Sequence, residues 1–467
     1  MKNSAFSFVA CIICFLYTLV ILDYLLITSI GLAFSLYIAL DFVNKLGQDY
    51  PLKQLIILLS AVQWVVGAKV SYAYGDIHYK YYMYVEEESY MTLVVPSLIA
   101  MYVGLSLFKV PNLKAKLDNL VSNLDFDRSQ AKRTANILLF FGVCGAVFGR
   151  VLHIPSLAFV FYIINLLIYI SVGYYFYAYP RKKTLIFILF ITLFFWEALL
   201  SGMFHNFLLV GVFLYLIYAK RETPFLKKMT IILLAVVFVN AIQIIKKDYR
   251  LIIWNNQTNN TEVFLELLEQ RFFENSAEEG VFNYGHNRKD ENEDVATVTT
   301  RINQGWIISK VLDNIPKNQD FLDGESVAGA ISASLLPRFL FPNKTSGNDA
   351  KKIYEKATGL KLFDNTAMGL SLAGEFYANF GVHGTWISCL LYGSFISLFL
   401  KMLVGYTNES PFILFWFVLI FFQVIKAESN LLSILNHLTK SIVFTYLFKH
   451  VLASLLNVQL FYNSKIR

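Results

Sequence analysis

The chain has 467 residues, of which 56% are hydrophobic, 16% are aromatic and only 16% are charged, and its mean hydropathy is +0.52. These values exclude an ordinary soluble domain and indicate a polytopic membrane protein. The formal net charge of +7 arises largely from cations in short connections between apolar runs, as orientation signals do, so nucleic acid is not an expected partner.

The apolar runs predict an all-α integral membrane protein of about twelve transmembrane helices, at roughly 20 residues per crossing. The predicted spans are residues 5–22, 25–41, 54–71, 91–108, 134–152, 156–178, 184–202, 204–219, 229–246, 372–401, 411–426 and 435–457. Little besides Asp23 separates the first two spans, so a single tilted helix over residues 5–40 is an open alternative.

Cationic residues occupy every second connection between the predicted spans. They are Lys45, Lys53, Lys109, Lys114, Lys116, Arg128, Lys132, Arg133, Arg181, Lys182, Lys183, Lys220, Arg221, Lys227 and Lys228. By the positive-inside rule this side is cytoplasmic, which places both termini inside. The chain then divides into an N-terminal bundle of about nine spans (1–246), a long extracytoplasmic loop (247–371) and about three C-terminal spans (372–467).

The long loop contains four stretches with apolar residues at helical spacing. They are Glu262–Phe273, Ile302–Ile315, Ser326–Leu336 and Asp349–Thr358. This pattern predicts short amphipathic helices that lie on the membrane. Pro316 and Pro337 are expected to end two of them, and Gly359 suits the end of the fourth.

Many ionisable residues fall at the predicted outer ends of spans. Two explanations fit this distribution: the side chains line a hydrated cavity for a charged head group, or their charged ends simply snorkel to the membrane surface. Arginine suits a phosphate group because its planar fork binds oxygen atoms in pairs and stays charged. Arg301 and Arg338 are the first candidates, and Arg250 is a further one. Arg271 is more typical of a surface ion pair. Arg288 is more typical of a solvated run of charged residues.

Glu375 and His383 are the two candidates for a general base near the start of the span 372–401. They are eight residues apart, so on an unbroken helix they would lie within about 100° of each other and about two turns apart. Either side chain could remove the proton of a sugar hydroxyl.

The connection from Tyr72 to Tyr90 is rich in tyrosine and contains the acidic triplet Glu86 to Glu88. The tyrosines could stack on sugars, although an aromatic belt at the interface explains most of them. The acids could hold a metal ion, although contiguous acids are more often a solvated face. The four cysteines all lie in apolar runs and predict neither disulfides nor a zinc site, and no cofactor is expected.

The motif Leu336-Pro337-Arg338-Phe339-Leu340-Phe341-Pro342-Asn343-Lys344, then Asp364-Asn365-Thr366, then Gly374 to Gly384, resembles the Wzy-type O-antigen and capsular repeat-unit polymerases. The motif covers about 50 residues, and the rest of the chain resembles the family only in its architecture. In this family a glycan on undecaprenyl pyrophosphate is transferred onto an incoming lipid-linked repeat unit, with no metal. The resemblance implies a bacterial cytoplasmic (inner) membrane protein of lipopolysaccharide, capsule or exopolysaccharide synthesis, with a chain-length regulator as a possible partner.

The resemblance also implies roles for particular residues. Arg301, Arg338 and Lys344 would bind pyrophosphate, with Glu375 or His383 as the base, while Tyr377 and Asn379 would position sugar or backbone. The chain departs from the family pattern at Thr345, where proline is expected, and it lacks the paired histidines of O-antigen ligases.

Two other functions fit parts of the sequence. A flippase for lipid-linked oligosaccharides also has about twelve spans, but it needs no long outer loop and places charges through the membrane depth. A metal-dependent lipid-sugar glycosyltransferase needs early carboxylates, and Asp76 with Glu86 to Glu88 are the candidates.

Overall fold

The computed structural model describes residues 2–74, 81–122, 127–152, 157–202, 204–255, 260–272, 302–335, 347–363, 366 and 368–461. These residues form a bundle of helices, and the only extended pairing among them is an isolated bridge between Leu46 and Asp49. The predicted all-α fold is therefore confirmed for the described part of the chain. Helices suit a lipid environment because each one satisfies its own backbone hydrogen bonds.

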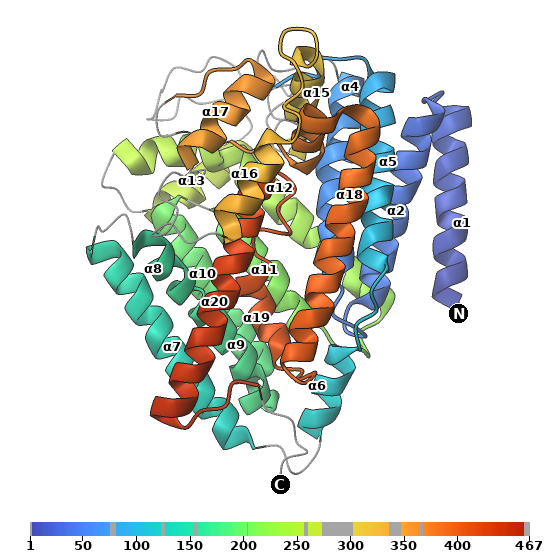
Figure 1. The fold of residues 1–467 in the computed structure, drawn as a ribbon. Coiled ribbons are helices and arrows are strands. Elements are labelled where there is room, and N and C mark those ends of the chain that lie inside the picture. The colour runs from blue at the N-terminus through green and yellow to red at the C-terminus, as the bar shows by residue number, and fades with distance from the viewer. Residues whose placement is uncertain are drawn as a thin grey trace.

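The first half of the chain supplies most of the bundle (Figure 1). Its elements are α1 (Lys2–Leu16), the π-helical turn η1 (Tyr17–Ile21), α2 (Leu26–Lys45), α3 (Leu52–Ala61), the π-helical turn η2 (Val62–Val66), α4 (Gly67–Tyr74), α5 (Glu87–Ser106), α6 (Leu113–Ser122), α7 (Arg128–Val151), α8 (Ala158–Asn165), α9 (Leu167–Ala178), η4 (Pro180–Lys182), α10 (Lys183–Ser201), α11 (Phe204–Tyr218) and α12 (Phe225–Asn255). Helices α1 and α2 pack against each other, and Asn44 near the end of α2 donates to Ser7 near the start of α1. The alternative of one long helix over residues 5–40 is therefore wrong.

Nine helices in the described residues are long and apolar enough to cross a membrane. They are Leu26–Lys45, Leu52–Tyr74, Glu87–Ser106, Arg128–Val151, Ala158–Ala178, Pro180–Ser201, Phe225–Lys246, Leu372–Tyr406 and Leu431–Leu456. Two shorter apolar helices, Ala5–Ile21 and Phe204–Tyr218, correspond to two further predicted spans. The chain is thus a membrane protein. Helices long enough to cross match nine of the twelve predicted spans, two further predicted spans correspond to shorter helices, and the last one, 411–426, differs as described below.

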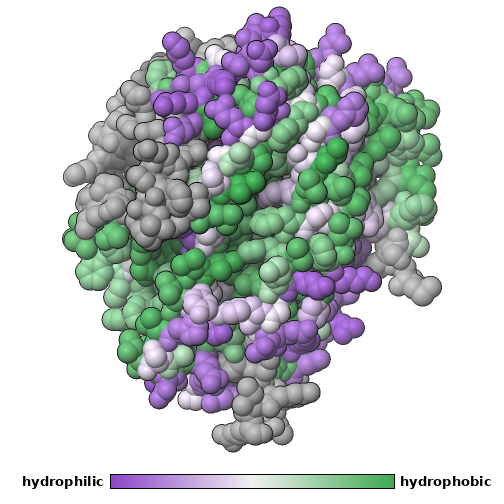
Figure 2. Space-filling model, viewed as in Figure 1, coloured by the Kyte–Doolittle hydropathy of each residue, from purple (hydrophilic) through white to green (hydrophobic). Residues whose placement is uncertain are grey.

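The two ends of the bundle are polar and a broad apolar belt lies between them (Figure 2). The start of α1 and the end of α20 (Leu431–Leu456) lie at one end, and the helices of the long loop lie at the other (Figure 1). The side chain of Arg133 at the start of α7 donates to the carbonyl of Leu456, which ties this cation-rich end to the end of α20.

All four predicted loop helices are present within a few residues of their predicted bounds. They are α13 (Asn260–Phe272), α15 (Gly305–Asn314), α16 (Glu325–Leu335) and α17 (Gly347–Thr358). Gly359 ends α17 with a φ of +71°, a conformation that glycine adopts without strain. Helix α16 packs against α20, with Ser326, Ala330 and Ala333 buried, so it is part of the bundle and does not simply lie on its surface.

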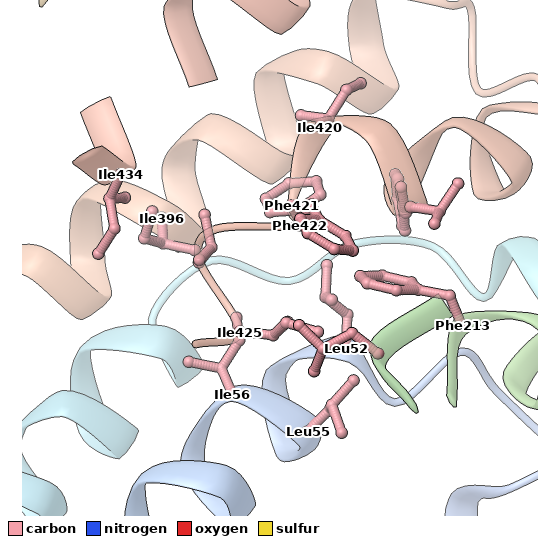
Figure 3. Packing of buried hydrophobic residues seen from close by; sticks show 14 of the residues in the cluster. Leu52, Leu55, Ile56, Phe213, Ile396, Ile420, Phe421, Phe422, Ile425 and Ile434 are labelled. Carbon is pink, nitrogen blue, oxygen red and sulfur yellow. The ribbon is translucent and has the colours of Figure 1, made fainter. Parts of the chain in front are cut away.

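The predicted span 411–426 is the exception, because it is not one helix. Only Ile413–Ile420 (α19) is helical, and eight residues rise about 12 Å, which is too short to cross a membrane. Residues 421–430, here called the connector, continue without a regular helix to the start of α20. Phe421, Phe422 and Ile425 of the connector are buried in the main apolar core together with residues of α3, α11 and α18 (Figure 3). The prediction of one span here is wrong because hydropathy reports an apolar environment and not the backbone conformation inside it.

Helix α18 (Leu372–Tyr406) carries the predicted site residues and packs extensively against α5. Its backbone leaves the helical region at Gly381, where φ is 66° and ψ is −165°. The first turns of α18, which contain Glu375, Tyr377 and Asn379, are thereby separated from the long helix that follows.

Candidate functional site

The carboxylate of Glu375 is the centre of a junction between three helices. Glu375 lies in the first turn of α18 and is only 3% exposed. One carboxylate oxygen accepts a hydrogen bond from Ser326 Oγ of α16 at 3.0 Å, and the other accepts from the backbone N–H of Leu431 at 2.7 Å. A buried carboxylate with two such partners holds the loop helix α16 to two spans of the bundle.

The N-terminus of α20 favours a negative charge at this place. The first N–H groups of a helix have no partner within the helix, and the helix dipole is positive at that end. Asn430 caps α20 by accepting from the N–H of Ser433 at 3.0 Å, and Glu375 accepts from Leu431. Within the part of the chain that the structure describes, the hydrogen bonds to the carboxylate come from neutral groups.

Asn379 and Tyr377 also hydrogen-bond within the protein. Asn379 Nδ2 donates to Ser326 Oγ and to the carbonyl of Glu375, each at 2.7 Å. Its buried Oδ1 has no hydrogen-bond partner among the described residues. The hydroxyl of Tyr377 donates to the carbonyl of Ile315 at 3.0 Å, which fixes the end of α15. Both side chains thus position the backbone and the neighbouring helix.

Glu375 lines a small pocket between α16, α17, α18 and the start of α20. Its polar wall consists of Ser326, Tyr354, Glu375 and Asn430, and its apolar wall consists of Ala350, Ile353, Met368, Leu370 and Leu432. Tyr354 is buried, and burial raises the pKa of its phenol, so the hydroxyl stays protonated. The pocket places a fixed carboxylate beside neutral polar groups.

His383 does not share this environment. It follows the break at Gly381, its side chain is exposed, and its ring packs edge-on against Trp386 at a centroid distance of 5.0 Å. The expectation that an unbroken helix sets Glu375 and His383 within about 100° of each other is therefore wrong.

The predicted phosphate-binding residues fall in different places. Arg301, Arg338 and Lys344 lie outside the described residues. Arg250 lies near the end of α12, and its Nε donates to the carbonyl of Gly202 at 2.7 Å. This hydrogen bond joins α12 to the turn between α10 and α11.

Several charges at the end opposite the start of α1 and the end of α20 form pairs. Lys69 binds Glu87 at 2.8 Å, Arg150 binds Glu197 at 3.0 Å, and His205 lies 3.5 Å from Glu428. Glu87 also accepts from Thr28, and Lys69 stacks on the ring of Tyr24. These contacts give the acidic triplet a structural role through Glu87, while Asp76 lies outside the described residues.

The tyrosines of the first outer connection also pack within the protein. Tyr72 donates to the carbonyl of Val85 and Tyr90 to that of Trp64. The ring of Tyr81 packs on Trp306, which attaches α15 to this connection. Packing and hydrogen bonding within the protein explain these described contacts without a bound sugar.

Three residues of this junction, Ser326, Tyr354 and Asn430, were not among the predicted site residues. The signal for Asn430 was present, because the polar step Glu428-Ser429-Asn430 before an apolar run is typical of a helix start. That signal also predicts the observed start of the last helix at Leu431. Nothing in the sequence pairs Ser326 with Glu375, since 49 residues separate them.

No curated protein and no solved structure matches the chain. A family model described as a domain of unknown function (DUF8712) matches residues 119–461. The match covers more than half of the chain and includes α16, α18 and α20, the helices that build the junction at Glu375. The chain therefore belongs to the DUF8712 family.

Proposed function

We propose that the protein polymerises lipid-linked oligosaccharide repeat units by glycosyl transfer at the outer face of a bacterial cytoplasmic membrane. The observation that carries this proposal is the buried carboxylate of Glu375 in the wall of a small pocket beside the helices of the long loop. A carboxylate held in this way suits the removal of a proton from an acceptor hydroxyl.

In the proposed reaction the acceptor hydroxyl oxygen forms a bond to the anomeric carbon of the donor glycan. The bond from that carbon to the lipid pyrophosphate breaks, and its electron pair leaves with the pyrophosphate. Glu375 takes the hydroxyl proton. Cations stabilise the leaving group, whose negative charge grows in the transition state, and Arg301, Arg338 and Lys344 are the residues proposed for this role.

Three further features support the proposal. The start of α1 and the end of α20 lie at the cation-rich end of the bundle, and the positive-inside rule favours the cytoplasm for that end and the extracytoplasmic side for the Glu375 junction. The crossing helices fit the architecture of the polymerases that the sequence resembles. The break at Gly381 and the exposure of His383 favour Glu375 over His383 as the base.

The test is chain extension by the purified protein in proteoliposomes that contain undecaprenyl-pyrophosphate-linked repeat units. Products with two or more repeat units are expected, resolved as a ladder on a gel. Movement of unextended units between leaflets would instead identify a flippase. Loss of extension on addition of a chelator would favour a metal-dependent transferase.

Deletion of the gene in its host gives a second prediction. The mutant is expected to keep single repeat units on its surface and to lose the ladder of longer chains. Accumulation of single units at the cytoplasmic face would contradict the polymerase proposal. The readout is the length distribution of lipid-linked and surface glycans.

A further inference from the structure

Two hydrogen bonds join the start of α18 to the connector and the start of α20. Ser371 Oγ donates to the carbonyl of Ala427 at 2.6 Å, and the N–H of Leu431 donates to the carboxylate of Glu375 at 2.7 Å. The two bonds are four residues apart on each of the two stretches of chain. Both stretches are therefore held together at the carboxylate and at one point beyond it.

Gly369 lets the same two stretches approach each other before α18 begins. A Cβ atom added at Gly369 would overlap the carbonyl oxygen of Glu428 and would lie 3.4 Å from the backbone nitrogen of Asn430. Both neighbours are backbone atoms, so neither can rotate away. The residues just before α18 are thus packed directly on the backbone of the connector.

The backbone of Ser371 is strained at this contact. Its φ is 62° and its ψ is 153°, a combination that is nearly exclusive to glycine because a Cβ atom crowds the neighbouring backbone. Ser371 is also fully buried. Strain of this kind persists only where the surrounding structure holds the residue in place, and it occurs most often at functional sites.

The hydroxyl of Ser371 does not do what serine usually does at the start of a helix. A serine at the N-cap normally accepts a hydrogen bond from one of the first N–H groups of the helix. Ser371 is the N-cap residue of α18, and its side chain makes no such bond to the first residues of that helix, all of which the structure describes. The hydroxyl is used for the contact with Ala427 instead. Local geometry and capping are both sacrificed for one contact with the connector.

The first turns of α18 depend on such contacts for their orientation. The break at Gly381 separates them from the long remainder of the helix, so that remainder does not fix their direction. Ser326 holds Glu375 to α16, and Tyr377 holds the end of α15. Ser371, one helical turn before Glu375, supplies the anchor to the connector.

We propose that Ser371 is a positioning residue for the carboxylate of Glu375. By holding the connector through Ala427, it keeps the N–H of Leu431 on the carboxylate and keeps the carboxylate in the wall of the pocket. The inference rests on the function proposed above only for its catalytic consequence, which is the placement of the base against the acceptor hydroxyl. A base displaced by about 1 Å can lose about 10²-fold in rate.

The first test is hydrogen–deuterium exchange, resolved to single amides, on the full-length protein and its Ser371→Gly variant in nanodiscs. Glycine adopts this backbone without strain, so the variant removes the hydroxyl and relaxes the backbone together. The N–H of Leu431 is expected to exchange about 3- to 10-fold faster, as the loss of one hydrogen bond predicts. The N–H of Ser433, which Asn430 caps, is the internal control and should not change. Equal exchange of Leu431 in both proteins overturns the proposal.

The second test is the initial rate of chain extension in proteoliposomes as the acceptor concentration is varied. Ser371→Gly is expected to lose about 10- to 100-fold in kcat while KM stays within about twofold, because the displaced base slows transfer after the substrate has bound. Its thermal midpoint should equal or exceed that of the wild type, since the strain is gone. A residue that only stabilises the fold would lose activity together with stability. Wild-type kcat in Ser371→Gly therefore overturns the proposal.

Two alanine variants complete the comparison. Ser371→Ala lacks the hydroxyl but keeps the strain, so it should lose kcat as Ser371→Gly does and have a lower thermal midpoint than that variant. Ser394→Ala is its matched control, because Ser394 lies on the same helix and its hydroxyl donates only to the carbonyl of Leu390 one turn earlier, at 2.7 Å. This control is expected to change neither kcat nor the exchange of Leu431.

Failure of this inference differs from failure of the proposed function. If Ser371→Gly speeds the exchange of Leu431 but the wild-type protein never extends a glycan, the function falls and the positioning of the Glu375 carboxylate by Ser371 stands. If the wild-type protein extends glycans and Ser371→Gly alters neither exchange nor kcat, only the role of Ser371 falls.

Discussion

Glu375→Gln is expected to stop chain extension while the protein remains folded and abundant. Glutamine has the same size, and its amide oxygen can still accept from the N–H of Leu431, so the start of α20 keeps its partner. The amide cannot take a proton from an acceptor hydroxyl. A positioned general base typically contributes 10² to 10⁴ in rate, so a loss of about that size is expected. The measurement is the initial rate of ladder formation in proteoliposomes.

Two controls separate catalysis from folding in this experiment. Ser326→Ala removes a hydrogen bond to Glu375 and the acceptor of Asn379 Nδ2, so it is expected to cost about 1–3 kcal/mol of stability. It leaves the carboxylate in place, and extension should continue at a reduced rate. His383→Ala changes an exposed side chain and should keep most of the activity. Full-length ladders from Glu375→Gln, or their loss in His383→Ala, would contradict Glu375 as the base.

The helices of the long loop could be predicted from the sequence because their signals are local. Apolar periodicity set their positions, and Pro316 and Gly359 marked two of their ends. The observed α15 and α17 differ from the predicted stretches by no more than three residues at either end. Periodicity and turn chemistry concern residues a few positions apart, and such short-range effects can be read in one chain.

The connector and the break in α18 could not be predicted, since neither changes the local composition. Irregular backbone buried within protein can be as apolar as a helix, so residues 411–426 resembled an ordinary span. Gly381 is one of several glycines in α18, and nothing in the sequence marks it, rather than Gly393 or Gly405, as the one with a φ of 66°. Which glycine leaves the helix depends on the surrounding packing.

The candidate site could be predicted only in part, because one of its signals is local and its other contacts join residues far apart in the chain. Glu375 stood out because a carboxylate beside an apolar run is costly, which is a local observation. Its partners Ser326 and Leu431 lie 49 and 56 residues away along the chain.

Gly393→Ala is expected to destabilise the protein strongly, because α5 and α18 approach each other closely at two glycines. A Cβ atom at Gly393 would lie 2.3 Å from the carbonyl oxygen of Met101, and one at Gly104 would lie 2.3 Å from that of Leu390. Both neighbours are backbone atoms, which cannot rotate away as a side chain can. Small residues at helix contacts in membranes allow this approach, and van der Waals packing along it stabilises the pair.

Gly405→Ala is the matched control, since it makes the same chemical change on the same helix at a position where an added Cβ would meet no described atom of another segment within 4 Å. Alanine favours a helix over glycine by about 1 kcal/mol, so this variant should be neutral or slightly more stable. Gly393→Ala should lose about 1–3 kcal/mol or more, as overpacked interiors do. The measurement is the thermal midpoint in detergent. Because both variants share the propensity gain, the difference between their midpoints reports the helix contact alone, and equal midpoints would contradict the close approach of α5 and α18.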